Sequence, residues 1–189
     1  MPDNAIRPLV EELDRWLRTS RPSYYACLKP PLTDSELGDL ESVLRGPLPS
    51  DLQALYRWKG GQLSGPEMLY EDKTFMQPGE IGIGVRSMNE LKEGGEFPSE
   101  EWWQPQWIPF LTDGLGNFVC VDEAGTFTGN RSQVITFRHD GPERNIEFPD
   151  LSSFLAGLLA GYEAALARGA LESATISYPA GYPIRRKAN

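Results

Sequence analysis

The sequence of 189 residues contains one histidine, His139, and only two cysteines, Cys27 and Cys120. These residues are too few, and the cysteines too far apart, to form a zinc site or a closely spaced redox pair. A catalytic triad would depend on His139, which adjoins a predicted turn and has no nucleophile-elbow sequence nearby. We interpret His139 as a strand-end residue that makes a local hydrogen bond. The scarcity of cysteine indicates a reducing compartment.

Long apolar segments are also absent. The first seven residues lack the apolar core of a signal peptide. The longest uncharged helical run, Leu151 to Tyr162, is too short to cross a bilayer. We therefore expect a soluble cytoplasmic protein that does not use a membrane.

Basic residues are outnumbered in this chain. It has 18 lysines and arginines against 27 acidic residues, which gives a net charge of −9 and an isoelectric point near 4.7. A protein that binds phosphates normally has the opposite balance, so nucleic acid is a poor candidate partner. A basic protein surface is a better candidate, because complementary electrostatic fields speed encounter.

Motifs for cofactors and for acid–base catalysis are missing as well. The glycines at 79, 82 and 84 follow neither the dinucleotide-binding order nor the phosphate-loop order. The glutamates between 90 and 101 lie in polar surroundings, which favours a solvated acidic face over paired catalytic carboxylates. The sequence thus predicts no enzyme active site, no cofactor and no metal.

The most informative stretch that is present runs from Trp107 to Asp122. Two apolar segments, 107–111 and 118–121, flank a turn rich in glycine, aspartate and asparagine. Such a turn between aromatic and β-branched segments predicts a β-hairpin at the centre of a sheet. A turn with two glycines and two Asx side chains could instead be a small binding site, although a plain connection is the simpler interpretation.

Helical periodicity and capping residues predict four helices around this hairpin. They cover residues 4–18, the segment after the capping box Thr33–Glu36, a short segment that starts with a second box at Ser50–Gln53, and the segment from Asp150 to Leu166. Three prolines make residues 20–31 a connector. The second and third helices should end at Gly46 and at Gly60-Gly61. In the last helix, the bare patch of Gly157 and Gly161 is expected to pack on the sheet.

Strand patterns complete the expected fold. The alternation of Ile81, Ile83 and Val85 with glycine predicts a strand with a bare face, followed by a short helical turn at 87–90 and a loop over 93–106. Two more strands are predicted at 134–139 and 145–148. From about 171 to 189 the pattern fades into a basic tail that is expected to be mobile. The order of elements predicts a single α+β domain over residues 1–170, with helices first, a mostly antiparallel sheet built on hairpins, and a C-terminal helix on the sheet.

A partner-binding face is predicted within residues 67–103, which carry nine acidic and three basic residues. Trp102 and Trp103 stand next to each other in a charged loop, and buried aromatic anchors with a charged rim dominate many interfaces. Core packing of one of the two tryptophans is an equally good interpretation. The predicted charged rim consists of Glu96, Glu100 and Glu101, with Glu71 and Asp72 as outlying members.

Three blocks of the sequence resemble the SUKH superfamily, which includes fungal regulators of cell-wall synthesis and many bacterial immunity proteins. The blocks are Leu48–Gly61, Trp107–Asn117 with Asp122, and Val134–Asp140 with Leu151–Phe154, and in this order they cover most of residues 33–166. Residues that match the family pattern are Gly60, Gly61, Asp113, Gly114, Gly116, Asn117 and Asp122. These family positions look structural.

The resemblance implies a single α+β domain without catalysis. For a bacterial member it implies binding and neutralisation of a co-encoded toxin, often a nuclease or another enzyme that modifies nucleic acid. The absence of a signal peptide favours a toxin that acts in the cytoplasm. The alternative is an intracellular regulatory or scaffold module of the fungal type, which a long disordered extension would favour.

Overall fold

The structure is a computed structural model that describes residues 6–171 and 174–188. The first two residues of the helix predicted from position 4, and positions 172, 173 and 189 of the tail, lie outside the described residues. Six helices are described: α1 (Ile6–Ser20), α2 (Pro22–Cys27), α3 (Asp34–Leu44), α4 (Ser50–Trp58), α5 (Pro78–Glu93) and α6 (Leu151–Ala167). The described strands are β1 (Thr74–Phe75), β2 (Trp107–Thr112), β3 (Phe118–Asp122), β4 (Gln133–Phe137) and β5 (Ile146–Phe148).

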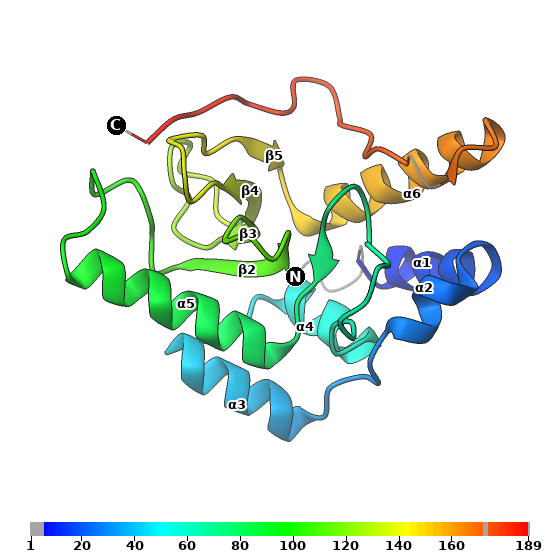
Figure 1. The fold of residues 1–189 in the computed structure, drawn as a ribbon, viewed down its shortest axis with the longest axis horizontal. Coiled ribbons are helices and arrows are strands. Elements are labelled where there is room, and N and C mark those ends of the chain that lie inside the picture. Colours follow the sequence, from blue (N-terminus) through cyan, green and yellow to red (C-terminus); the bar gives the residue numbers. More distant parts are fainter. Residues whose placement is uncertain (1–5, 172–173, 189) are drawn as a thin grey trace.

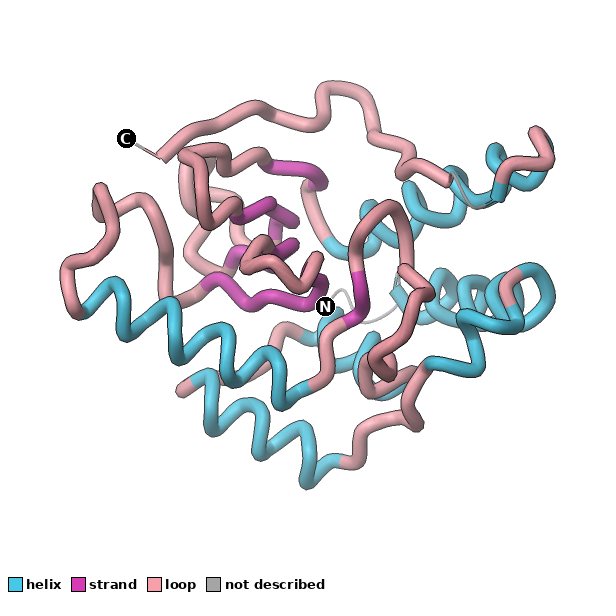
Figure 2. Tube along the Cα trace, viewed as in Figure 1, coloured by secondary structure: helices cyan, strands magenta, loops and turns pink. Residues whose placement is uncertain are grey.

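The strands form one antiparallel sheet in the order β1-β2-β3-β4-β5. In Figure 1 the helix α6 lies on one side of the sheet, with α1 and α4 beside it, while α5 runs under β2 and α3 lies outside α5. Figure 2 shows how loops connect the strands at both ends of the sheet. The predicted α+β architecture, with N-terminal helices and a C-terminal helix on the sheet, is confirmed.

Local signals explain most of these elements. Thr33 caps α3 through a reciprocal capping box with Glu36. Asp150 caps α6, because its Oδ1 accepts a hydrogen bond of 2.6 Å from the backbone N–H of Ser153. The predicted hairpin is the β2–β3 pair, in which Thr112 lies opposite Phe118. All residues of β3 are buried, so the hairpin is also the centre of the core.

The predicted strand around residues 81–85 is wrong, because this segment forms the middle of α5. Pro78 occupies the first turn, and the Glu80 carboxylate accepts a hydrogen bond of 2.7 Å from the backbone N–H of Gln77. The glycines allow neighbouring side chains to pack closely on the backbone of α5. A Cβ at Gly82 would lie 3.1 Å from Val43 of α3, and one at Gly84 would lie 3.3 Å from the Phe118 ring. Packing on both sides of α5 therefore outweighs the low helix propensity of glycine.

Smaller predictions also need correction. The connector 20–31 contains α2, because Pro22 is well suited to the first turn of a helix. The second predicted capping box does not form, since the residue that precedes α4 is Pro49. The helix α4 ends at Trp58 and the following residue, Lys59, is extended, so the two glycines at 60 and 61 do not terminate it directly.

The C-terminal segment is packed against the rest of the molecule. The backbone N–H and C=O of Ile184 form hydrogen bonds of 2.8 and 2.9 Å with Ile146 of β5. Gly157 and Gly161 of α6 face this segment, because a Cβ at either position would lie 2.1–2.3 Å from a carbonyl oxygen of residue 175 or 177. The bare patch on α6 thus accommodates residues 174–177, and the described part of the tail is not free. Figure 1 shows the segment crossing the top of the sheet.

Candidate functional site

The candidate site lies at the end of the sheet where β1, β3 and β5 begin and β2 and β4 end. An open hollow of about 480 Å³ occupies this end. It is lined by Asp72, Lys73, Asp113, Asn117, Phe118, Thr136, Phe137, Arg138, Glu143, Asn145 and Glu147. Four carboxylates and two cations therefore surround it. Asp72 was predicted to bind a partner and Asp113 and Asn117 to be structural, and the fold brings all three to one place.

The hairpin turn forms one wall of the hollow. The Asp113 Oδ1 atom accepts hydrogen bonds from the backbone N–H groups of Leu115 (2.8 Å) and Asn117 (3.2 Å), and its Oδ2 atom accepts one of 2.6 Å from the Asn117 side chain. Burial opposes ionisation of Asp113, but these hydrogen bonds outweigh it and lower the pKa of the carboxyl. Gly114 and Gly116 have φ angles of 75° and 93°, as the predicted turn requires. At the tip, Leu115 is 74% exposed.

Asn117 also connects the hairpin to the end of β4. Its Oδ1 atom accepts a hydrogen bond of 3.0 Å from the backbone N–H of His139 and lies 3.1 Å from His139 Nδ1. The predicted local role of the single histidine is therefore confirmed, since its ring contacts the hairpin turn and it is exposed to solvent.

Glu147 is the most buried acid of the hollow, with a relative exposure of 9%. Its carboxylate accepts a hydrogen bond of 3.2 Å from the Thr136 hydroxyl, and the Tyr178 hydroxyl and the Asn145 amide also bond to it. Burial raises the pKa of Glu147 because the charged form loses hydration, although these three partners partly offset the effect. Glu147 was not predicted from the sequence, where its only signal is a single acid between Ile146 and Phe148 in a predicted strand.

The loop that precedes β1 forms another wall, next to the hairpin turn. Lys73 of this loop makes an ion pair with Asp72, and its charge contributes to the lowered pKa of Asp113. The loop is held from behind by Arg21, whose guanidinium donates hydrogen bonds of 2.8 Å to the carbonyls of Leu69 and Met68. Glu71 adopts a left-handed backbone conformation with φ 48°. Burial raises the pKa of its carboxyl.

The two adjacent tryptophans differ in accessibility. Trp103 is completely buried and packs edge-on against Trp107 and Phe137, so it has no surface to offer a partner in this structure. Its indole N–H donates a hydrogen bond of 2.8 Å to Asn89 Oδ1. Trp102 is half-buried and stacks on the guanidinium of Arg144.

Arg144 was not identified from the sequence, yet it holds the tryptophan loop to the sheet. It is fully buried between the rings of Trp102 and Phe137, with its carbon Cζ 4.8 and 4.4 Å from the two centroids. Its Nε–H donates to the Trp102 carbonyl (3.0 Å), and Nη1 donates to three further carbonyls between residues 138 and 143. Burial lowers the pKa of Arg144 to about 10.

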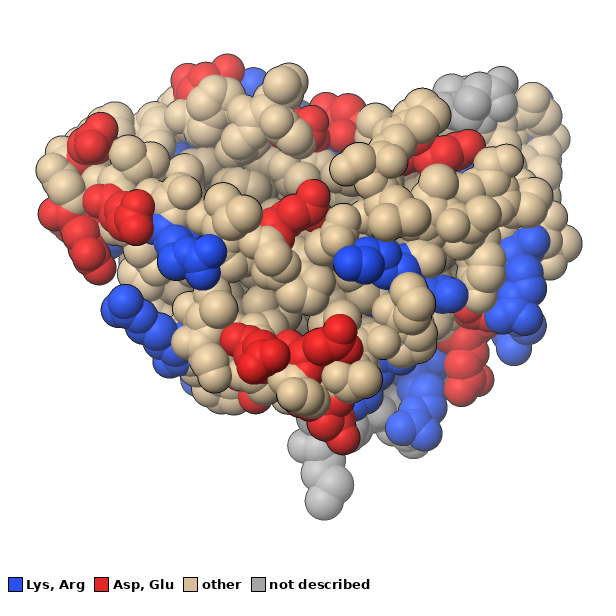
Figure 3. All heavy atoms as spheres, turned by 60° about the horizontal axis from the view of Figure 1, so that its bottom comes forward, with Lys and Arg blue, Asp and Glu red and all other residues tan. Residues whose placement is uncertain are grey.

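The remaining acids of the predicted face do not line the hollow. Glu96 and Glu100 are exposed, Glu101 is half-buried, and Lys92 forms an ion pair of 3.1 Å with Glu100. Figure 3 shows that acidic side chains on the face carrying α3 and α5 gather in separate groups with Lys and Arg between them. This face is therefore not uniformly acidic.

The other signature residues have structural surroundings. A Cβ at Gly60 would lie 2.8 Å from the Pro30 carbonyl oxygen, and one at Gly61, whose φ is 96°, would lie 2.7 Å from that of Met76. Asp122 is fully buried and accepts hydrogen bonds of 2.7–3.1 Å from the backbone N–H groups of residues 124, 125 and 126. It shapes the loop between β3 and β4.

Within residues 6–171 and 174–188, no group of three His, Cys, Asp or Glu side chains could hold a metal ion. In the same part of the chain, no helix has both the length and the apolarity needed to cross a membrane.

No curated protein matches the sequence. The model of the SMI1 / KNR4 family (SUKH-1) matches residues 31–157, which is more than half of the chain. This range contains the central hairpin, the hollow and all seven signature residues. The chain belongs to the SMI1 / KNR4 family of SUKH proteins.

Proposed function

We propose that the protein is an immunity protein that binds and neutralises a co-encoded toxin in the cytoplasm, and that it has no catalytic activity of its own. The toxin is a nuclease or another enzyme that modifies nucleic acid. Such an enzyme carries a basic face for its substrate, which a protein with a net charge of −9 would attract. Membership of a family of protein-binding modules supports this proposal.

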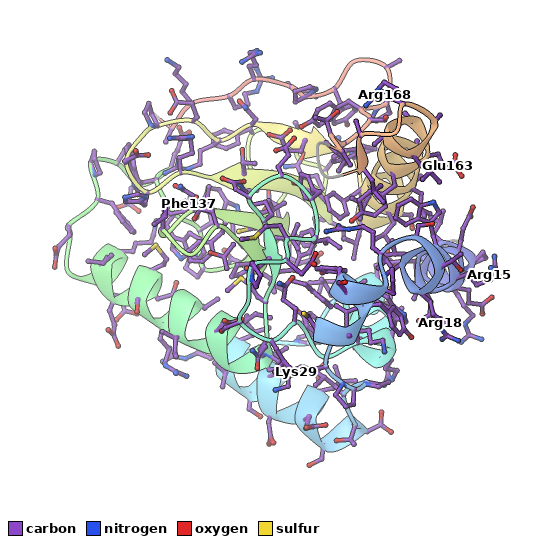
Figure 4. The ribbon with its side chains drawn as sticks, turned by 45° about the vertical axis from the view of Figure 1, so that its right-hand side comes forward. Arg15, Arg18, Lys29, Phe137, Glu163 and Arg168 are labelled. Carbon is purple, nitrogen blue, oxygen red and sulfur yellow. The ribbon has the colours of Figure 1, made fainter. Side chains whose placement is uncertain are left out.

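The observation that carries the proposal is the hollow at the end of the sheet. Four carboxylates line it, and Leu115 at the tip of the adjoining hairpin turn is 74% exposed. An apolar anchor next to complementary charges is the arrangement that gives an interface both lifetime and specificity. Figure 4 shows Phe137, which lines the hollow, on the opposite side of the molecule from Arg15, Arg18 and Arg168. These three cations therefore do not weaken the attraction of the hollow for a basic surface.

The acidic loop near the tryptophans is proposed as a second part of the interface. Reversal of both charges in a Glu100→Lys/Glu101→Lys variant should slow association and weaken its salt dependence, because steering acts over about 8 Å at physiological salt. The half-buried Trp102 is the aromatic candidate, and Trp102→Ala should raise the dissociation rate about tenfold or more, equivalent to ~1.4 kcal/mol.

The test starts from the gene adjacent to the one that encodes this chain. The C-terminal domain of its product is expressed with and without this protein, and both growth and direct binding are measured. We expect toxicity that this protein relieves, with the kinetic changes above in surface-plasmon measurements. Glu163→Lys on α6 is the matched control for charge reversal, since Glu163 is exposed and distant from the hollow. A toxic domain that is neither bound nor neutralised would refute the proposed function.

A further inference from the structure

Glu147 is a buried carboxylate without a cationic partner. None of the ion pairs in the described part of the chain includes it. Its hydrogen bonds come from two hydroxyls and one amide, all of them neutral. Buried carboxylates are usually paired with a cation, because removal of the charge from water is costly. The unpaired charge lines an open hollow rather than a closed core.

The two cations of the hollow are already paired with carboxylates other than Glu147. Lys73 pairs with Asp72, and Arg138 lies 3.3 Å from a carboxylate oxygen of Asp140. The Asp113 carboxylate is used by the hairpin turn. Glu143, which also lines the hollow, makes none of the described ion pairs. Glu147 and Glu143 are therefore the two carboxylates of the hollow outside the described ion pairs, and of these Glu143 also interacts with the charge of Arg144.

The dimensions of the hollow suit one long side chain of a partner. Its volume of about 480 Å³ falls within the range of small ligand sites, about 300–1,000 Å³. Apolar atoms of the lining residues, which include Phe118 and Thr136, offer contact to the methylene stem of a basic side chain. Leu115 on the hairpin tip would contact the apolar surface around its base.

We propose that the hollow is a receptor for one arginine or lysine side chain of the protein partner, which inserts beside Leu115 and meets the carboxylates of Glu147 and Glu143. This inference rests on the proposed function, because it names the chemical group by which a toxin would be recognised. A planar guanidinium can engage two carboxylates at once, so arginine should bind more strongly than lysine. A metal ion is a poorer occupant, given that no metal-binding group of three ligands exists among the described residues.

The first experiment needs no toxin. The ¹⁵N-labelled protein is titrated with N-acetyl-arginine amide, N-acetyl-lysine amide and N-acetyl-norleucine amide, and backbone amide shifts are followed by NMR. We expect the two cationic compounds to shift the amides of Asn117, Thr136 and Glu147, with no such effect from norleucine. In Glu147→Gln the affinity should fall about tenfold, whereas Glu163→Gln should behave as the wild type.

The second experiment uses the toxin domain from the neighbouring gene. Glu147→Gln should raise its dissociation rate about tenfold or more, because a charge of the partner then loses its buried counter-charge. Glu143→Gln should give a smaller increase, since Glu143 is less buried. Both glutamines keep the side-chain shape and a hydrogen-bond acceptor, and thermal unfolding checks that each variant is folded.

The outcomes separate this inference from the proposed function. Wild-type toxin kinetics in both glutamine variants would overturn the receptor hollow and leave the immunity role intact. It would also be overturned if N-acetyl-norleucine amide shifted the backbone signals as much as the two cationic compounds do. A toxin domain that this protein does not bind would refute the immunity role, and the amide titration would still decide whether the hollow takes a cationic side chain.

Discussion

At the residue scale, the turn of the central hairpin is fixed by two kinds of residue. Gly114 and Gly116 supply left-handed backbone conformations, and Asp113 binds the backbone N–H groups that the turn leaves free. Each contribution is local and is visible in the sequence. The tertiary fold adds the contact between Asn117 and His139, which connects the turn to β4 and so positions one wall of the hollow.

Replacement of either turn glycine by valine should lower the free energy of unfolding by about 1–3 kcal/mol, because a β-branched side chain is strained at positive φ. Gly116→Val should be the more harmful change, since a Cβ there would lie 3.4 Å from the His139 ring, whereas Gly114 has open space. Urea denaturation measures the loss. The matched control is Gly38→Ala in α3, where an added Cβ would meet no neighbouring group within 4 Å and alanine should stabilise the helix by about 0.5–1 kcal/mol. Unchanged unfolding in both valine variants would contradict this account of the turn.

At the scale of elements, the loop between α5 and β2 is a good example of sequence neighbours with different roles. Trp103 is inserted into the core, and Lys92 of α5 donates hydrogen bonds to the carbonyls of Glu100 and Trp103. Trp102 is only half-buried and stacks on Arg144. The loop thus holds its acidic residues on a fixed support rather than on a free chain.

Trp103→Ala should destabilise the fold by about 3–5 kcal/mol, because it leaves a large cavity among three aromatic rings. Trp102→Ala should cost clearly less, since its ring is only half-buried. Thermal and urea unfolding of the two variants test this difference. Equal losses would show that Trp102 belongs to the core as well, and would remove it as a candidate for partner binding.

At the scale of the whole molecule, the C-terminal segment closes the fold. Residues 174–177 lie over α6, Tyr178 stacks on Phe148, and Ile184 pairs with β5. The segment therefore covers the outer edge of β5, which would otherwise expose unpaired backbone groups. Through Tyr178 it also contributes a hydrogen bond to Glu147 of the hollow.

Gly161→Ala should displace this segment, because a Cβ would lie 2.1 Å from the Thr175 carbonyl oxygen. We expect a loss of about 1–3 kcal/mol in the free energy of unfolding and faster proteolysis within residues 174–188. Ala160→Ser at an exposed position of α6 is the control and should change neither quantity by much. If Gly161→Ala keeps wild-type protease resistance, the segment is not held by this close approach.

The sequence by itself determined the α+β class, the capped helices α3 and α6, the central hairpin and the family, because periodicity, caps and turn chemistry act over a few neighbouring residues. Only the tertiary structure decided the rest. The glycine-rich segment 78–93 became a helix because α3 and Phe118 pack closely on its bare faces. The hollow depends on residues far apart in sequence, such as Asp72, Asp113 and Glu147. They come together because successive antiparallel strands alternately begin and end at the same end of the sheet. Burial raises the pKa of Glu147 and removes Trp103 from the surface. It is a property of the tertiary packing and not of the local sequence pattern.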